Sequence, residues 1–377
     1  MLTHAFVAAI LAQSAPAAAQ EPAAPKGAAP AAPAAPGTVS GRIPDSASPA
    51  CDAAGAPGIA MLVAADARPD LIINGLQFAE GPTSDAQGQT YFCDMSGSRI
   101  YRIVRTATGI RADVVADGTL STSGLAWSRD GRLFGTQFSG GKVVEVVLAA
   151  DGSGTLRSVV PALDVKPMTG ANDLVTDGAG GIWFSNMGDP RRSELRGVFY
   201  TTDTGAEPVR FDVPAVKAPN GIRLSPDGRT LYVVDYKLPQ VWAFPVEGPA
   251  KLGEGRPFAS LSVVGDPKQV LGGDGLAVDV LGNVWVAVPR ASAIVVFDPQ
   301  GKPLGRIMLP NYPSNCAFGG PDGRSLYITA RDGIYVLPTL VQGHWTAKGG
   351  APPVKAAAPA PASIAAPAAA PAVEPTK

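Results

Sequence analysis

Histidine is almost absent from this chain: its 377 residues include only His4, near the start, and His344, after the last expected strand. These positions exclude a Ser-His-Asp triad, a Cys-His pair and a histidine-built zinc site from the central part of the sequence. The sequence contains neither a CxxC pair nor a P-loop, and its glycines are dispersed rather than clustered. Acid–base chemistry must therefore depend on carboxylates, on a metal-activated water, or on Lys and Tyr side chains.

The chain also lacks an excess of positive or negative charge, and it has few long apolar runs. The formal net charge is −1 at pH 7, which gives no indication of a nucleic acid or an anionic membrane as partner. No segment after residue 19 approaches the ~20 apolar residues that a membrane span needs. The partner we expect is a small-molecule substrate.

Cysteine is also rare. The three residues are Cys51, Cys93 and Cys316, and an odd number argues against a disulfide framework. The repeats described next place Cys93 and Cys316 in neighbouring units, so one disulfide in an oxidising compartment stays open. Buried thiols that pack as small hydrophobic groups are the favoured interpretation.

What the sequence does contain is a turn motif that recurs six times. The six strings are SDAQGQTYF, SRDGRLF, TDGAGGIWF, SPDGRTLYV, DVLGNVWV and PDGRSLYI. Each turn follows a short apolar segment and precedes a run of aromatic and β-branched residues, which predicts a strand–turn–strand unit. The turn glycines recur at intervals of 41 to 54 residues, a period typical of four-stranded propeller blades. We predict an all-β, six-bladed β-propeller.

Closure of the ring can be predicted too. The sixth unit supplies three strands, NCAF, SLYITA and GIYVL, and lacks a fourth. Residues 70–73, just before the first unit, form a strand without a partner. Pairing this N-terminal strand with the last blade closes the ring and removes two exposed sheet edges. The predicted propeller domain spans residues 58–345.

The two ends of the chain have a different composition. Residues 5–12 form a short apolar run and residues 17–19 are three alanines, so residues 1–19 resemble a secretory signal peptide. This predicts a periplasmic or secreted protein. Residues 20–57 and 346–377 are rich in Ala and Pro and cannot build a core, so we expect a linker and a disordered tail.

One structural position carries an oxygen-bearing side chain in every unit. It lies eight residues before each turn glycine and is occupied by Glu80, Ser123, Asn172, Asn220, Asp274 and Asn315. Inner strands line the shaft of a propeller, so these residues predict a ring of oxygen ligands at its mouth. Two carboxylates would repel each other there unless a cation lay between them. The set suits Ca²⁺, then Mg²⁺ or Mn²⁺, whereas Zn²⁺ is tolerated but not favoured. The alternative is that each residue only bonds water or the backbone at a strand start.

Other aspartates have a structural interpretation. Four of them lie in the turns at the opposite face, where turn chemistry explains them. These four are Asp85, Asp130, Asp227 and Asp322. Asp94 and Asp235 end second strands, where we expect them to cap loops.

Four strings resemble the senescence marker protein / gluconolactonase / luciferin-regenerating enzyme family of six-bladed propellers. They are FAEGPTSDAQGQTYFCDMSGSRIYRI, APNGIRLSPDGRTLYVVD, GGDGLAVDVLGNVWVA and PSNCAFGGPDGRSLYITA, within residues 74–337. The resemblance implies that Glu80, Asn220 and Asp274 bind a divalent metal, often Ca²⁺. It implies that Asn172 contacts the metal or the substrate. It further implies hydrolysis of sugar lactones, with Asp274 doubling as general base.

The chain also departs from this family. Many sugar-lactone members have an arginine two residues before the asparagine that aligns with Asn172, whereas this chain has Gly170. Arg191 and Arg192, in the loop after the second strand of blade three, are candidates to replace it. Asn172 and Asn315 are further candidate substrate contacts. The alternative is that both arginines are solvated loop residues.

We therefore expect a metal-dependent lactonase, a gluconolactonase-like carboxylic ester hydrolase. The metal would act as a Lewis acid, and Asp274 or a metal-activated water would serve as the base. The alternatives are a metal-dependent phosphotriesterase resembling diisopropylfluorophosphatase and a non-catalytic metal-binding propeller. A deep polar pocket over the ion would favour an enzyme, and a broad, flat, apolar face would favour a binding protein.

Overall fold

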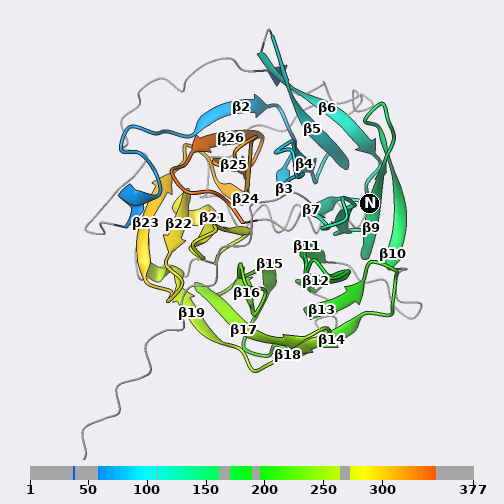
Figure 1. Cartoon of the computed structure of the whole chain (residues 1–377), viewed down its shortest axis with the longest axis vertical. Helices are drawn as coiled ribbons and strands as arrows, with labels where there is room; N and C mark the ends of the chain where they lie inside the picture. Colours follow the sequence, from blue (N-terminus) through cyan, green and yellow to red (C-terminus); the bar gives the residue numbers. More distant parts are fainter. Residues whose placement is uncertain are drawn as a thin grey trace, which may run out of the picture.

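Six small antiparallel sheets surround a central axis in the computed structural model (Figure 1). The model describes residues 58–107, 109–160, 170–188, 196–263 and 272–344, together with a two-residue strand at 37–38. The prediction of an all-β, six-bladed β-propeller is confirmed. The predicted signal peptide (1–19) and tail (346–377) lie outside the described residues, as do Cys51 and, apart from 37–38, the predicted linker (20–57).

Each blade is an antiparallel meander whose first strand lies nearest the central axis. Blade one contains β3 (Ala79–Ser84), β4 (Thr90–Asp94), β5 (Arg99–Thr106) and β6 (Gly109–Asp117). Blade two contains β7 (Thr122–Trp127), β8 (Leu133–Gln137), β9 (Lys142–Leu148) and β10 (Gly154–Val160). Blade three contains β11 (Ala171–Thr176), β12 (Gly181–Asn186), β13 (Gly197–Thr202) and β14 (Val209–Phe211). Blade four contains β15 (Pro219–Leu224), β16 (Thr230–Asp235), β17 (Gln240–Gly248), β18 (Lys251–Leu252) and β19 (Arg256–Ser260). Blade five contains β20 (Leu276–Val278), β21 (Val284–Val288), β22 (Ala293–Phe297) and β23 (Pro303–Met308).

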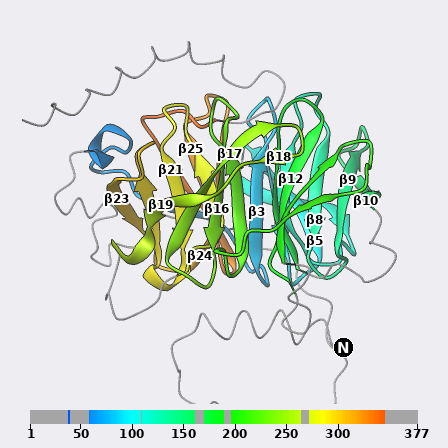
Figure 2. The same cartoon turned by 90° about the horizontal axis from the view of Figure 1, so that it is seen from below.

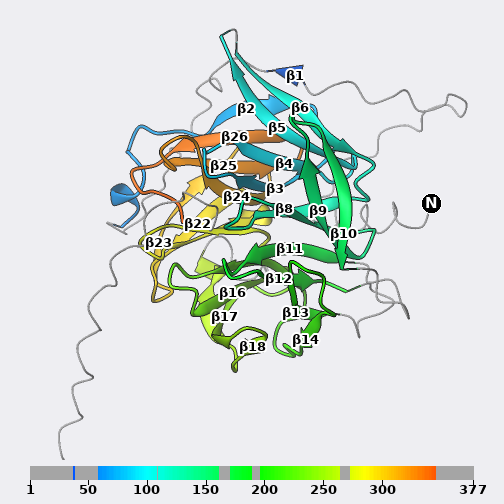
Figure 3. The same ribbon diagram turned by 45° about the vertical axis from the view of Figure 1, so that its right-hand side comes forward.

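Blade six combines the two ends of the described chain. It contains β24 (Pro313–Gly319), β25 (Ser325–Ala330) and β26 (Gly333–Pro338), followed by β2 (Asp70–Asn74) and β1 (Gly37–Thr38). β2 pairs antiparallel with β26, with Leu71 opposite Tyr335 (Figure 3). The predicted closure by an N-terminal strand is confirmed, and it covers the edge of β26 that would otherwise be open to another chain.

Helix is nearly absent from the described residues. The helical segments are the short 3-10 helices η1 (Ile59–Met61), η3 (Leu261–Val263) and η4 (Pro289–Ala291). No helix in the described part is long and apolar enough to cross a membrane. Loops therefore join almost all of the strands, and they gather at the two ends of the ring (Figure 2).

The core lies between neighbouring blades, where large side chains from the second strands are fully enclosed. Trp183 of β12 packs against residues of blade four, and Trp285 of β21 meets the ring of Phe318 edge-on at 5.4 Å. Trp127 of β7 meets Tyr91 of blade one in the same way at 5.3 Å. Burial of one such side chain stabilises a fold by about 1.5–3 kcal/mol. These tryptophans therefore pack between neighbouring blades.

The two described cysteines are structural. Cys93 on β4 and Cys316 on β24 are buried and unpaired, which confirms the favoured interpretation of free thiols. Burial raises the pKa of Cys316 to about 12, so its thiol stays protonated at neutral pH and is a poor nucleophile.

Candidate active site

One end of the central shaft opens into a pocket of about 590 Å³, including its open mouth. Four of the six predicted ring residues line it, although up to 194 positions separate them in the sequence. These four are Glu80, Asn172, Asn220 and Asp274. The structure thus brings together the side chains predicted to bind a metal, while the role itself stays a prediction.

Irregular strand pairing occurs where the ring residues lie. The register of β3 with β4 shifts between Glu80 and Thr83, and the inner strands of blades two, three, four and six shift at the equivalent place. In blade five, Asp274 precedes the first residue of β20. An extra residue in one strand redirects its side chains. We infer that these bulges turn the ring residues toward the shaft.

Glycine follows the ring residue in blades one, two, four and five, where a neighbouring inner strand lies close to it. A Cβ atom on Gly81 would lie 2.0 Å from the carbonyl oxygen of Ser123, and one on Gly221 would lie 2.4 Å from that of Asp274. Both distances are well below van der Waals contact, so a side chain at either position would force two blades apart. The Glu-Gly and Asn-Gly pairs are therefore packing requirements of the narrow shaft.

Hydroxyl groups of second strands hold the backbone of the next ring residue. Thr136 on β8 donates to the carbonyl oxygen of Asn172, and Ser185 on β12 donates to that of Asn220. Ser123 Oγ also donates to the Asn172 carbonyl oxygen, at 2.6 Å. Blades two and three thus each position the ring residue of the next blade. Ser123 does not line the pocket, and its role is this support.

Glu80 is a buried carboxylate without a cationic partner in the described part of the chain. Its Oε2 accepts hydrogen bonds from the backbone N–H of Gly81 at 2.9 Å and from Asn315 Nδ2 at 3.3 Å. Burial, followed by the charge of Asp274, raises the pKa of Glu80 well above its ordinary value. Two hydrogen bonds do not offset the loss of solvent and the nearby negative charge.

Asp274 is likewise a buried carboxylate without a cationic partner among the described residues. Burial raises its pKa to about 8; a hydrogen bond from the Asn220 side chain opposes this rise and the charge of Asp173 adds to it. Without a cation, this end of the shaft therefore favours protonated carboxyl groups at neutral pH. A nearby positive charge would favour the ionised forms of both.

The amide groups of the site are oriented by a sulfur atom. Nδ2 of Asn172 and Nδ2 of Asn220 lie 3.3 and 3.7 Å from Sδ of Met187, to which both donate. Oδ1 of Asn220 is buried and has no hydrogen-bond partner among the residues that the structure describes. An unsatisfied buried acceptor costs about 1–3 kcal/mol, and coordination to a cation would satisfy it. The residues therefore fit a hard divalent ion.

The composition of the set narrows the choice of ion. Among the described residues no three His, Cys, Asp or Glu side chains come together. The candidate ligands are two carboxylates and amide oxygens, a set that suits Ca²⁺ or Mg²⁺ better than Zn²⁺.

Asn315 supports Glu80 and lies outside the pocket lining. Its Oδ1 accepts the backbone N–H of Cys316 at 2.9 Å, and its Nδ2 donates to Glu80. The predicted contact between Asn315 and a substrate stays a prediction. Arg191 and Arg192 lie outside the described residues. Gly170 has a φ of +95°, a conformation that an arginine would adopt only with strain.

One buried ion pair was not predicted from the sequence. Asp173, adjacent to Asn172, is fully buried and forms an ion pair with Arg223 at 2.9 Å, and it also accepts the backbone N–H of Leu174. The sequence contains a signal for it. The residue after the ring position is glycine in blades one, two, four and five, whereas blade three has an aspartate there.

A second ring of side chains was also missed. The first residue after each second strand lines the pocket in all six blades. These residues are Met95, Phe138, Met187, Tyr236, Pro289 and Arg331. Counting forward from the expected second strands would have found this ring. It forms the pocket wall beside the candidate metal ligands.

The other predicted aspartates have the expected structural roles. Asp94 accepts backbone N–H groups of Gln77, Phe78 and Gly97, so it caps a loop. Asp235 caps the loop around residue 237 in the same way. At the opposite face, Asp85 and Asp322 accept backbone N–H groups within their own turns, which confirms turn chemistry.

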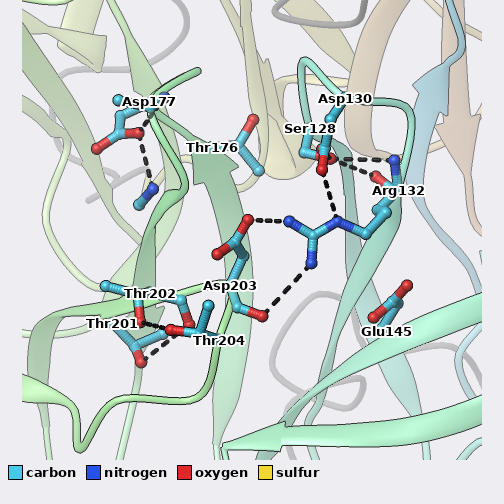
Figure 4. Close-up of polar contacts among 12 residues, drawn as sticks. Ser128, Asp130, Arg132, Glu145, Thr176, Asp177, Thr201, Thr202, Asp203 and Thr204 are labelled. Atoms are coloured by element: carbon cyan, nitrogen blue, oxygen red, sulfur yellow. Dashed lines mark hydrogen bonds and ion pairs between the residues drawn. The ribbon is translucent and has the colours of Figure 1, made fainter.

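Ion pairs also bind the blades together at that opposite face. Arg132, in the turn before β8, reaches both Asp130 in its own turn and Asp203 in blade three (Figure 4). A hydrogen bond from Ser128 has the largest effect and lowers the pKa of Asp130. Partial burial raises this pKa, and the contact with Arg132 lowers it further, so the net shift is downward. These carboxylates are thus charged and neutralised without any added ion.

Comparisons with known proteins agree with this geometry. The family model described as SMP-30/Gluconolactonase/LRE-like region matches residues 78–332. Pentonolactonase XacC of Haloferax volcanii is 28% identical over 269 residues, covering 68% of this chain and 82% of that protein. Lactonase drp35 of Staphylococcus aureus strain MRSA252 is 25% identical over 241 residues, covering 63% and 71%.

Two solved structures have the same fold. The gluconolactonase XC5397 of Xanthomonas campestris aligns with a TM-score of 0.63 and 26% identity, covering 83% of this chain and 99% of that chain. The calcium-binding protein regucalcin of Agrobacterium tumefaciens aligns with a TM-score of 0.58 and 22% identity, covering 72% and 94%. At that identity the second match supports the fold alone.

Proposed function

We propose that this chain, which belongs to the SMP-30/gluconolactonase/LRE-like family, hydrolyses the ring of a small lactone with the help of a divalent cation. One observation carries the proposal. Glu80 and Asp274 are buried at one pocket with Asn220, whose Oδ1 lacks a hydrogen-bond partner in the described part of the chain. The relatives named pentonolactonase, lactonase and gluconolactonase support lactone chemistry.

The candidate ligands of the ion are Glu80, Asn220 and Asp274, with Asn172 as a fourth. Ca²⁺ is the ion that suits them best, and Mg²⁺, Mn²⁺ or Zn²⁺ are the alternatives. When bound, such an ion supplies a Lewis acid for the carbonyl oxygen of the substrate.

Asp274 is the proposed general base. A pKa of about 8 would leave it mostly protonated at pH 7, whereas an adjacent cation would lower this pKa and free the carboxylate to accept a proton from water. The water oxygen then forms a bond to the lactone carbonyl carbon and the ring C–O bond breaks. The ring oxygen leaves as a hydroxyl group after it takes up the proton, and the product is a hydroxy acid.

Substrate and location follow as finer proposals. The substrate is proposed to be a sugar lactone or a related small lactone, because similar proteins are named pentonolactonase and gluconolactonase. The apolar run and three-alanine site within residues 1–19 support export to the periplasm or the medium.

The alternatives have less support. A phosphotriesterase resembling diisopropylfluorophosphatase could use a similar ligand set, but the similar proteins reported above are named for lactones. A non-catalytic binding protein would be favoured by a flat apolar face, whereas the described residues form a pocket that two buried carboxylates line.

A substrate panel tests the proposal. Protein treated with a chelator and then given Ca²⁺, Mn²⁺ or Zn²⁺ is assayed on γ- and δ-lactones and on a phosphotriester, with proton release as the readout. We expect metal-dependent opening of at least one lactone. Turnover that is unchanged by the chelator would contradict the metal dependence, and turnover of the phosphotriester alone would support the first alternative.

A further inference from the structure

The second ring of pocket residues is divided into two unlike halves. Blades one to three contribute Met95, Phe138 and Met187, which are all apolar. Blades four to six contribute Tyr236, Pro289 and Arg331. The pocket thus has an apolar wall on one side and a wall with polar groups on the other.

The apolar wall is a packed unit. Met95 and Phe138 are buried against each other, and the half-buried Phe78 and Met187 pack onto them. The backbone of Gly170 joins two members of this wall, because its N–H donates to the Phe138 carbonyl oxygen and its carbonyl accepts the Met187 N–H, both at 2.9 Å. The wall is therefore held in place by backbone hydrogen bonds as well as by packing.

Few polar groups on this side could bind hydroxyls of a substrate. Among the described lining residues of blades one to three, only Glu80 and Asn172 have polar side chains. Both belong to the candidate metal site, and the Asn172 amide nitrogen already donates to Met187.

The opposite wall has a different chemistry. Tyr312 and Arg331 line the pocket together, and the guanidinium carbon of Arg331 lies 5.3 Å from the centre of the Tyr312 ring. Tyr236 adds a phenol on the same side. Among the described lining residues, the positive charge and the phenol groups therefore belong to blades four to six.

We infer that the substrate is a lactone with an apolar substituent, and that the substituent lies against the wall formed by Phe78, Met95, Phe138 and Met187. This inference deepens the proposed function and rests on it. With the carbonyl group at the candidate metal site, a ring substituent on the side of blades one to three would lie against the carbon and sulfur atoms of this wall, which are the described lining groups there apart from Glu80 and Asn172. A polyhydroxylated lactone would lose water from its hydroxyls there without gaining partners.

Two lactones of equal ring size test this inference. δ-Decalactone carries an alkyl chain, whereas glucono-δ-lactone carries hydroxyl groups, and δ-valerolactone serves as the unsubstituted reference. We expect kcat/KM for δ-decalactone to exceed that for glucono-δ-lactone by at least about 10-fold, since one methylene group in an apolar pocket is worth about 10–200-fold.

A matched pair of variants locates the effect. Met95→Gln places an amide of similar length in the wall and should reduce the preference for δ-decalactone about 10-fold. Met61→Gln makes the same change on η1, where the side chain is 73% exposed and outside the pocket, and should leave the preference unchanged. The comparison of the two lactones with the wild-type protein does not depend on how well either variant folds.

Product binding separates failure of the inference from failure of the proposed function. Calorimetry compares 5-hydroxydecanoate with gluconate, whether or not turnover is seen. Preferred hydrolysis of glucono-δ-lactone would overturn the inference and leave the lactonase proposal standing. Absence of all lactone turnover with preferred binding of 5-hydroxydecanoate would overturn the lactonase proposal and retain the apolar site. Absence of all lactone turnover together with no preferred binding of 5-hydroxydecanoate would overturn both, and equal turnover of the two lactones would overturn the inference alone.

Discussion

Carboxylates at the two ends of the propeller shaft lie in opposite surroundings. At the pocket end, Glu80 and Asp274 are buried, and neither forms an ion pair among the described residues. At the other end, Asp130 and Asp203 share Arg132 (Figure 4). Burial raises the pKa at the first end, whereas a hydroxyl and a guanidinium lower the pKa of Asp130 at the second.

This difference shows how one fold uses the same residue type for two purposes. The turn carboxylates at the Arg132 end complete their own hydrogen bonding and contribute to the scaffold. The carboxylates at the pocket end are incomplete without a ligand, which is the arrangement expected of a functional site. Asp173 lies close to Glu80 and Asp274, yet its carboxylate forms an ion pair with Arg223 at 2.9 Å.

The largest expected effect comes from Asp274→Asn. This change keeps an oxygen near the ion but removes a negative charge and the proposed proton acceptor. Turnover of a lactone at saturating Ca²⁺ or Mn²⁺ should fall more than 10²-fold, because general-base catalysis is worth about 10²–10⁴-fold. Asp130→Asn, the matched change at the other end, should leave turnover unchanged. Near-normal activity in metal-loaded Asp274→Asn would remove Asp274 as the base.

Removal of the metal should lower the free energy of unfolding, and this loss should depend on the carboxylates at the pocket end and not on those at the other end. Ca²⁺ at ~100 times its dissociation constant should stabilise the fold by about 2.7 kcal/mol, since it satisfies Glu80, Asp274 and the orphaned Asn220 oxygen. Melting with Ca²⁺ and with a chelator measures this effect. Asp274→Asn should lose most of the shift and Asp130→Asn should keep it. Identical melting temperatures with and without Ca²⁺ in the wild type would count against a metal site.

In the metal-free protein, the raised pKa of Asp274 should determine how the free energy of unfolding changes with pH. Asp274 titrates near 8 in the folded state and near 3.8 when unfolded, so between these values the folded state holds the extra proton. The free energy of unfolding should therefore fall as pH rises from about 4 to 8, by up to about 1.4 kcal/mol per pH unit for each such proton. Urea unfolding in a chelator measures the slope. A flat profile, or one that Asp274→Asn does not change, would argue that Asp274 stays ionised.

Asn220→Ala should produce a smaller defect than loss of Asp274. It removes one neutral ligand and leaves the proposed base in place, so metal affinity should weaken about 10-fold, of the order seen when a supporting group of a metal site is removed. Turnover should recover as the metal concentration is raised. A defect that persists at saturating metal would instead assign Asn220 a direct part in the reaction.

The smallest effect should come from Arg132→Gln at the opposite end. Arg132 and Asp203 are partly exposed, and ion pairs of this kind contribute about 0.2–1 kcal/mol. Urea unfolding should show a loss of that size, with unchanged kcat/KM on a lactone. A large loss of turnover would show that the two ends are coupled.

Local pattern was sufficient to predict most of the fold. Strand and turn preferences recur in every unit, so the number of blades, the inner strands and the closing role of β2 could all be read from the sequence. The six positions that bear Glu80 and its equivalents could be read as well, because the interval between each of them and its turn glycine is constant.

The candidate site was less predictable. Only four of the six ring residues reach the pocket, because Ser123 and Asn315 are turned to the backbone of Asn172 and to Glu80. The wall that includes Met95 and Phe138 went unnoticed because it begins after the second strands, where no turn motif marks the position.

By itself, the sequence determined the repeat, the ring of oxygen-bearing positions and the strand that closes it, since all three depend on neighbours along the chain. Tertiary structure decided which of these oxygens share one pocket, which are satisfied and which are not. Those outcomes depend on contacts between blades, such as the hydrogen bond from Asn315 to Glu80 across 235 residues. Burial, charge and hydrogen bonding at the shaft arise only when the ring has closed and distant residues meet out of water.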